Sequence, residues 1–576
     1  MDQLTDKPEW HRKVFDEDIV SKWKAEALAV PDKEWILIAT RDKDEWVTSS
    51  AGIEGIIDEE TFETTLQELR VKAKYFEESN IIPTLDACSS VAKSDTLVPA
   101  ELHEALRTAF AKLKESQAAN PDWHPNSDDT VQDLVHPSMY PLVYGRSLVV
   151  RDEKVGVTDA VEKWSGKGDV IEKEDIDLSG VQLDSSFTMD GGSKVPPHFW
   201  SSTYQWLPAN VAFQENGSVK FTSYINNLHP VKHADIYRTI EELIKTSLPM
   251  WDQCLVVAHD LWKREGAGRT KCRMAMPENR SDEDRENWIP SDPQEYAHVE
   301  VDWEKEKTLE YDPEWDDETE LKWELFRKPR IPRVPFEDNV AYNPPEHLKL
   351  STKFKETGLQ IICKLASIEL TPEKPNFPAG GWHVEGQMNE HIAATALYYL
   401  DSENVTDSCL SFRMQTDDES RIELQQGQDQ WHWLEHIYGT DLGDSAPCLQ
   451  NYGSVETRQG RLLAFPNVFH HRVSSFSLLD KTKPGHRRFI ALWLVDPHQR
   501  IISTANVPPQ QQDWWLESIF GNNKDSQVDA AAKIPPEILV LIKDQLPTPA
   551  AEVPIRQPGS LPPEMMEMKR ENTDWN

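Results

Sequence analysis

The segment Gly380–Asp401 reads GGWHVEGQMNEHIAATALYYLD, and it raises the question whether His383 and Glu385 are two ligands of a metal. Its second half, HIAATALYYL, is an apolar run with internal tyrosines that predicts a β-strand. Just before this strand, His383 and Glu385 lie two positions apart, so both side chains can point to one side of an extended backbone. A neutral imidazole and a carboxylate on one face are suitable ligands for iron, manganese or zinc.

The tripeptide HVE does not establish a metal site by itself, because it occurs twice, at His298–Glu300 and at His383–Glu385. A chain with 18 histidines and 99 acidic residues is expected to contain such triplets by chance. The first copy lies in an acidic segment without a strand pattern, so the second copy is favoured. A third ligand has to come from elsewhere, and the later stretch GRLLAFPNVFHHRVSSF offers His470 and His471.

The surroundings of this segment are rich in short strands separated by Gly, Pro and Asn. The strand candidates are LQIICKLASIEL, HIAATALYYL, SCLSFRMQ, GRLLAFPN and RRFIALWLV. Strands spaced in this way predict a sandwich or barrel over about residues 351–524, in contrast to α/β alternation. Upstream, helices are predicted in TFETTLQELRVKAKYFEES, PAELHEALRTAFAKLKES and HADIYRTIEELIKTSL, and a hairpin is predicted around ENG.

These patterns divide the chain into five predicted regions. They are a mainly helical N-terminal region (1–188), a β-hairpin and helix segment that packs on the core (189–262), an acidic Pro-rich insert or linker (263–350), the β-rich domain (351–524) and a loosely ordered tail (525–576). The predicted fold class is therefore α+β. A second histidine pair, His432 and His436, lacks the zinc-protease order, and we expect it to serve capping or packing.

Composition limits the partners. The 61 basic and 99 acidic residues give a formal net charge of −38, which argues against nucleic acid or an anionic membrane as the main partner. The six cysteines are far apart and form no C-x-x-C pair, and the charged first residues lack the apolar core of a signal peptide. We therefore expect an intracellular protein of the cytoplasm or nucleus, without a membrane span.

Four stretches, in this order, resemble the Fe(II)- and 2-oxoglutarate-dependent oxygenases with a double-stranded β-helix core, nearest to their prolyl-hydroxylase-like branch. They are WHVEG, TALYYLD, GRLLAFPNVFHHRV and GHRRFIALWLVD, and together they cover about Leu359 to Asp496. The resemblance implies a jelly-roll or cupin-like core. The stretches YQWLPANVAF, SYINNLHP and DPHQRIISTANVPPQQ also look like a family of large fungal proteins of uncharacterised function, which implies an architecture and no substrate.

The resemblance implies that His383, Glu385 and His471 bind Fe(II). His471 is preferred over His470 because His471, Arg472 and Val473 reproduce the H-x-V pattern of that branch. Most of the branch has Asp where this chain has Glu385, and the histone-demethylase-like branch has the H-x-E form.

The resemblance also implies two residues that bind 2-oxoglutarate. Arg487 corresponds to the arginine that binds its distal carboxylate, since Trp493 follows six residues later, and Arg488 is the competitor on the opposite face. Tyr399 is a candidate hydrogen-bond donor to the same carboxylate, although a packing role is equally open.

The implied function is an Fe(II)/2-oxoglutarate-dependent dioxygenase that uses O2 to oxidise an unknown small-molecule or protein substrate. One alternative is a catalytically inactive β-barrel scaffold that binds a protein partner. Another is a metal-dependent enzyme with a non-oxidative reaction. The sequence leaves the substrate and the oligomeric state open.

Overall fold

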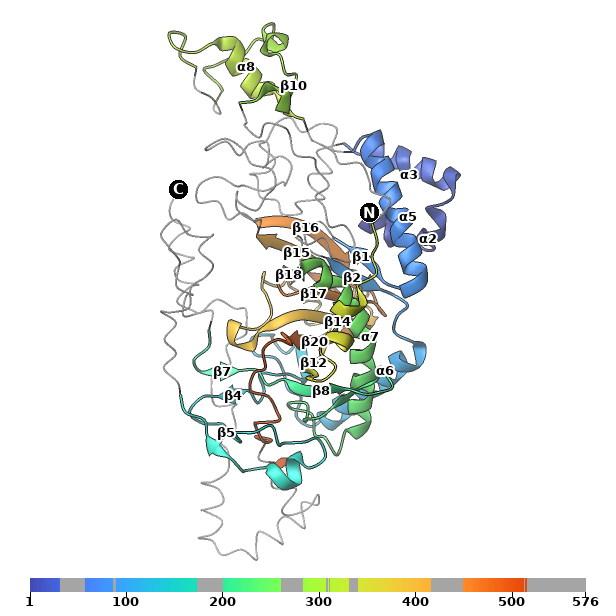
Figure 1. The fold of residues 1–576 in the computed structure, drawn as a ribbon, viewed down its shortest axis with the longest axis vertical. Coiled ribbons are helices and arrows are strands. Elements are labelled where there is room, and N and C mark those ends of the chain that lie inside the picture. The colour runs from blue at the N-terminus through green and yellow to red at the C-terminus, as the bar shows by residue number, and fades with distance from the viewer. Residues whose placement is uncertain are drawn as a thin grey trace, which may run out of the picture.

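The computed structural model describes residues 1–31, 57–85, 90–173, 200–259, 283–306, 309, 311–330, 340–415, 449–511 and 513–514. Over these residues the chain forms a mixed α/β structure around a large antiparallel sheet (Figure 1). The predicted strands of the β-rich domain are confirmed, and so are the hairpin around ENG and the three upstream helices.

The large sheet collects strands from four distant parts of the sequence. In spatial order they are β1 (Ile82–Thr84), β2 (Val91–Ser94), β17 (Leu462–Pro466), β14 (Ile392–Glu403), β20 (Gly485–Val495), β12 (Leu359–Leu370), β8 (Ala209–Phe213) and β9 (Val219–Phe221). Strand β3 (Val131–Val135) also pairs with β12. The region predicted to be mainly helical thus supplies three strands of this sheet.

A smaller sheet faces the central strands of the large one. It is formed by β16 (Leu449–Glu456), β15 (Cys409–Gln415) and β18 (His470–Val473), and β13 (Asn376–Phe377) pairs with β19 (Phe476–Ser477) beside it. Side chains from both sheets share one buried cluster, which includes Phe412 and Val455 from the smaller sheet and Leu397 and Trp493 from the larger. We call the space between the two sheets the interior.

Helices cover the opposite face of the large sheet. The helices α6 (Ala100–Ser116) and α7 (Ala234–His259) place Phe110 and Ile240 in the same buried cluster as Leu365 and Leu492 of the sheet. Because β12, β14 and β20 are buried on both faces, they read as nearly continuous apolar runs. Helix α7 is longer than predicted and continues through Pro249, since its last turns are also apolar.

The N-terminal helices form a separate layer. The helices α1 (Asp2–Thr5), α2 (Trp10–Lys13) and α3 (Glu17–Ala29) join α5 (Glu59–Ser79) in a cluster around Trp10, Trp23 and Leu66. Ion pairs tie this layer to the sheet, because Asp6 bonds to Lys93 at 2.9 Å and to Arg461 at 2.7 Å. Both cations are almost completely buried.

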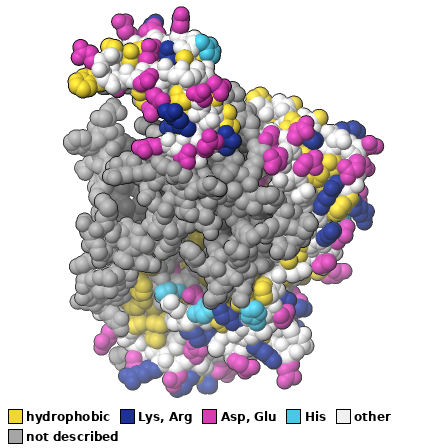
Figure 2. Space-filling model, turned by 45° about the horizontal axis from the view of Figure 1, so that its top comes forward, with side chains coloured by type: hydrophobic (Ala, Val, Ile, Leu, Met, Phe, Trp, Pro, Cys, Tyr) yellow, Lys and Arg dark blue, Asp and Glu magenta, His cyan; other side chains and the backbone are white. Residues whose placement is uncertain are grey.

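The remaining elements are short. They are β4 (Leu142–Val143), β5 (Leu148–Val149), η1 (Ala160–Trp164), β6 (Asp169–Val170), β7 (Tyr204–Gln205), η5 (Arg285–Asn287), β10 (Trp288–Ile289), η6 (Pro293–Tyr296), α8 (Glu318–Phe326), β11 (Lys328–Pro329), η7 (Glu346–Leu348), α9 (Leu350–Lys353) and η8 (Met388–Glu390). Figure 2 shows many Asp and Glu side chains on the segment that carries α8, at the top of that view. No helix in the described part of the chain is both long and apolar enough to cross a membrane.

Candidate metal and cosubstrate site

The interior face of the large sheet consists of four rows of side chains. Directly opposite residues on antiparallel strands point to the same side, so the strand register defines each row. The first row contains Phe465, Thr395, Trp493 and Ile362, the second Leu463, Leu397, Ala491 and Lys364, the third Tyr399, Phe489 and Ala366, and the fourth Arg487 and Ile368.

The structure brings His383, Glu385 and His471 together. The amide of His383 donates to the carbonyl of His471 at 3.2 Å, and the amide of His471 donates back at 2.9 Å, so the two segments are held as a β-bridge. The rings of the two histidines are 4.4 Å apart. One possible ligand atom from each of the three residues lies within 4.8 Å of the others.

In both His383 and His471 the position of Nδ1 near a backbone carbonyl leaves Nε2 facing the other residues of the group. Nδ1 of His383 donates to the carbonyl of Gly381 at 2.8 Å, and Nδ1 of His471 is 3.4 Å from the carbonyl of Phe469. Nε2 of His471 is 3.2 Å from Oε1 of Glu385. Both nitrogens of His471 therefore face acceptors, which suits an imidazolium or a ring with a cation at Nε2.

The electrostatics keep the carboxylate ionised and one ring neutral. Burial raises the pKa of Glu385, but the hydrogen bond from His471 and the charges of His471 and His383 outweigh it and lower this pKa to about 2. Burial lowers the pKa of His383, and His471 lowers it further. An ionised carboxylate and a neutral imidazole are the forms that bind a metal.

Asn467 is a site residue that the sequence analysis missed. Its side-chain oxygen accepts from the amide of Glu385 at 2.9 Å, and its side-chain nitrogen donates to the carbonyl of Glu385 at 2.9 Å. A further bond to the carbonyl of Ile392 ties the same side chain to strand β14. The signal was the FPN sequence, which Val468 and Phe469 separate from the histidine pair.

Aromatic side chains enclose His471 on the interior side. Its ring lies 4.9 Å from Phe465 and 6.4 Å from Phe412, measured between ring centroids. His471 is 3% exposed, whereas its neighbour His470 is only half-buried. Adjacent residues of a strand point to opposite faces, so only His471 faces the group.

Arg487 and Arg488 point to opposite faces of the large sheet. Arg487 shares the interior face with Phe489 and Trp493 and is buried, while Arg488 points to the opposite face, which the helices cover, and pairs with Asp401 at 3.4 Å. The guanidinium of Arg487 bonds to the hydroxyl of Ser408 and to the carbonyl of Thr406, and it lies 4.2 Å from the ring of Phe476.

Tyr399 lies one row away from Arg487 on the same face, and its hydroxyl has no side-chain hydrogen bond to any described residue. Burial raises the pKa of Tyr399, and the charge of Arg487 opposes this shift. The phenol is therefore a neutral donor beside a cation.

Several polar atoms of the interior lack a hydrogen-bond partner among the residues that the structure describes. They include Oγ1 of Thr395, Nε of Arg487, Nε1 of Trp493 and Oδ1 of Asp133. Such buried atoms are uncommon because each costs free energy unless it is paired. Their presence in one interior is consistent with a polar ligand.

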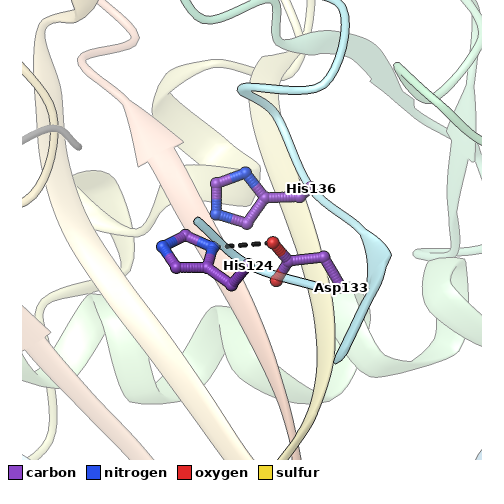
Figure 3. Close-up of side chains that lie close together, drawn as sticks. All are labelled: His124, Asp133 and His136. Atoms are coloured by element: carbon purple, nitrogen blue, oxygen red, sulfur yellow. Dashed lines mark hydrogen bonds and ion pairs between the residues drawn. The ribbon is translucent and has the colours of Figure 1, made fainter. Parts of the chain in front are cut away.

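A second group, which the sequence analysis did not identify, consists of His124, Asp133 and His136 (Figure 3). One possible ligand atom from each lies within 4.8 Å of the others, as in the first group. Asp133 lies opposite Ala366 in the sheet, so its side chain reaches the interior. Nδ1 of His124 bonds to Oδ2 of Asp133 at 2.7 Å.

The hydrogen bonds of this second group do not suit a metal. Burial raises the pKa of Asp133, but the bond from His124 and the charge of His136 lower it, so His124 must be the donor to an ionised carboxylate. The amide of Ser138 donates to Nδ1 of His136 at 3.1 Å. Since burial lowers the pKa of His136 well below its usual range, the neutral ring carries its proton on Nε2, where a metal would need a lone pair.

The other predicted positions do not join either group. His298 and Glu300 are exposed on the acidic segment, outside both groups. His432, Glu435 and His436 lie outside the described residues, as does the possible helix PPEILVLIKDQL of the tail.

A family profile described as "Protein of unknown function (DUF4246)" matches residues 59–518 of this chain. A second profile, described as the N-terminal domain of unknown function DUF4246, matches residues 1–26. No curated protein matches the sequence.

Among solved structures, the chain is 18% identical to an Fe(II)/(alpha)ketoglutarate-dependent dioxygenase, TqaL, and covers 27% of itself and 48% of that chain, with a TM-score of 0.15. It is 13% identical to a non-heme alpha ketoglutarate dependent epimerase, SnoN from nogalamycin biosynthesis, covering 23% of itself and 47% of that chain, with a TM-score of 0.14. It is 11% identical to IDO from Bacillus thuringiensis, covering 29% of itself and 68% of that chain, with a TM-score of 0.15. The chain thus spans about half the length of the first two structures.

Proposed function

The chain belongs to the DUF4246 family, whose function is unknown, and we propose that it is an Fe(II)- and 2-oxoglutarate-dependent oxygenase with a double-stranded β-helix core. The two facing antiparallel sheets support this fold. Strands β17, β14, β20 and β12 face β16, β15 and β18 across one apolar cluster. The candidate metal residues lie at one end of that cluster.

In this proposal Fe(II) would be held by Nε2 of His383, a carboxylate oxygen of Glu385 and Nε2 of His471. Two histidines and one carboxylate on one side of a metal leave positions open for other ligands. With 2-oxoglutarate and O2, such a centre supplies C–H oxidation in which the keto acid becomes succinate and CO2, and one oxygen atom enters the substrate.

The residues of the chain have separate tasks. The carbonyls of Gly381 and Phe469 fix the two rings, and Asn467 holds the backbone of Glu385 in place. The aromatic rings around His471 keep water from that side of the centre. Tyr399 and Arg487, further along the interior, are the proposed donors to the distal carboxylate of 2-oxoglutarate.

The observation that carries the proposal is the orientation of the two rings. Each ring directs Nδ1 at a carbonyl and leaves Nε2 for the group that also contains the ionised Glu385. A scaffold that only binds a protein partner has no need of this arrangement.

The test uses metal-free protein that is reconstituted with Fe(II) without oxygen. Addition of 2-oxoglutarate should produce a weak visible charge-transfer band in the parent and in His298→Ala, which alters the other HVE copy. The band should be absent in His383→Ala and should require more 2-oxoglutarate in Arg487→Ala. A parent that binds iron no better than His383→Ala would contradict the proposal and favour the scaffold. A parent that binds iron but gives no band would favour a non-oxidative metal enzyme.

A further inference from the structure

Lys364 is the charged residue of an otherwise apolar row. It lies in the second row of the interior face, opposite Ala491, and Ile362 and Ala366 flank it on the same face of β12. The first row contains Phe465, whose ring contacts His471. Along the strand direction Lys364 is one row from the row that contains Phe465, whereas Arg487 is three rows from it.

The ammonium of Lys364 has no acidic partner among the described residues. No ion pair within 4.0 Å and no hydrogen bond of this side chain is present in that part of the chain, and its one aromatic neighbour is Phe489, 5.9 Å from the ring centre. The residue is half-buried. Taking an ammonium partly out of water without a counter-ion is unfavourable, so the position favours binding of an anion.

The charge of Lys364 acts on both histidine groups. It contributes to lowering the pKa of Glu385 and of His383 on one side, and of Asp133 and of His136 on the other. Its charge is therefore felt by residues of both groups. Asp133 does not neutralise it, because that carboxylate already accepts from His124.

We propose that Lys364 binds the carboxylate of a 2-oxo acid at the end next to the metal, while Tyr399 and Arg487 act on the distal carboxylate. This inference rests on the proposed function. A short acid that has only the proximal carboxylate should then depend on Lys364 and be indifferent to Arg487. A five-carbon diacid should depend on both cations.

The experiment compares pyruvate with 2-oxoglutarate, because pyruvate lacks the distal carboxylate. Fe(II)-loaded protein is titrated with each acid without oxygen, and the charge-transfer band gives the dissociation constant. The variants are Lys364→Met, Lys364→Arg and Arg487→Met, and the exposed Lys355→Met serves as the matched control. Thermal unfolding of each variant verifies that it is folded.

Loss of a charged hydrogen bond is worth about 1.5–3 kcal/mol, or roughly 10- to 100-fold in affinity. Lys364→Met should weaken both acids by this factor, Lys364→Arg should recover part of it, and Arg487→Met should weaken 2-oxoglutarate alone. Unchanged binding of both acids in a folded Lys364→Met would overturn the inference and leave the oxygenase proposal intact. Weakening of 2-oxoglutarate alone in this variant would also overturn it, since Lys364 would then act at the distal end. A parent that binds neither acid would contradict the proposed function itself.

Discussion

The groups His383–Glu385–His471 and His124–Asp133–His136 have the same composition, and in each of them the possible ligand atoms lie within 4.8 Å of one another. They differ in what holds the rings. In the first group carbonyl oxygens occupy Nδ1 of both histidines. In the second, Nδ1 of His124 donates to the carboxylate of the group, which in the first group faces Nε2 of His471, and Nδ1 of His136 accepts from an amide. Composition and proximity are thus insufficient to identify a metal site, and the hydrogen-bond direction at each ring nitrogen discriminates between the two.

The largest expected effect concerns metal content. Removal of a ligand in His383→Ala or His471→Ala should lower Fe(II) affinity by more than about 100-fold, since even outer contacts of metal ligands contribute roughly 10- to 100-fold. His124→Ala and His136→Ala should retain one Fe(II) per chain, as should the exposed control His298→Ala. Metal analysis after equilibrium dialysis measures this. Two ions per parent chain, with one lost in His124→Ala, would remove the distinction between the groups.

A smaller effect is expected on the free energy of unfolding, and here a substitution in the second group should have the larger effect. His124→Ala removes a 2.7 Å bond to Asp133, which is 3% exposed, and leaves a buried carboxylate without its donor. The free energy of unfolding should fall by about 2 kcal/mol, measured by urea unfolding of the metal-free protein. His298→Ala should change it little. An unchanged unfolding midpoint in His124→Ala would show that the bond contributes nothing to folding.

The smallest effect is a pH dependence beside the second group. Burial and the charge of Asp133 raise the pKa of Asp122 from 3.8 to about 6, so the folded protein holds this proton more tightly than the unfolded chain. The resulting stability is present below the unfolded pKa and is lost as the pH rises through the folded value. Because Asp122 is partly exposed, the parent should lose only about 1 kcal/mol relative to Asp122→Asn between about pH 4 and about pH 6.5. Equal losses in both proteins would contradict the assignment.

The helices and strands that could be predicted from the sequence are those long enough to show a periodic pattern of apolar residues. Strands β12 and β14 have 12 residues each, and helices α5 and α6 have 21 and 17, so their apolar patterns are unmistakable. Strands β1 and β2 have only 3 and 4 residues, too few to show alternation. Their place in the sheet depends on pairing with β17, far away in the sequence.

Those site residues could be predicted that belong to a sequence motif or whose side chain has a known face in a predicted strand. The pairing of His383 with His471 and the inward face of Arg487 both follow patterns that can be read along the chain. The second group has no such pattern, because His124, Asp133 and His136 meet only through the bend that leads into β3. Lys364 did leave a signal, a single cation in the buried strand LQIICKLASIEL, whose meaning depends on which face it occupies.

The composition of the large sheet has a consequence for how the protein can be divided. A fragment of residues 351–524 would retain the candidate metal residues, but it would lose β1 and β2 beside β17, and β3 and β8 beside β12. Both edges of its central sheet would then present unpaired backbone groups, which is a template for aggregation. Pairing between such distant segments also makes folding slow, since the chain has to close long loops before the strands meet. Soluble protein for the experiments above is therefore best sought from the full chain, expressed slowly.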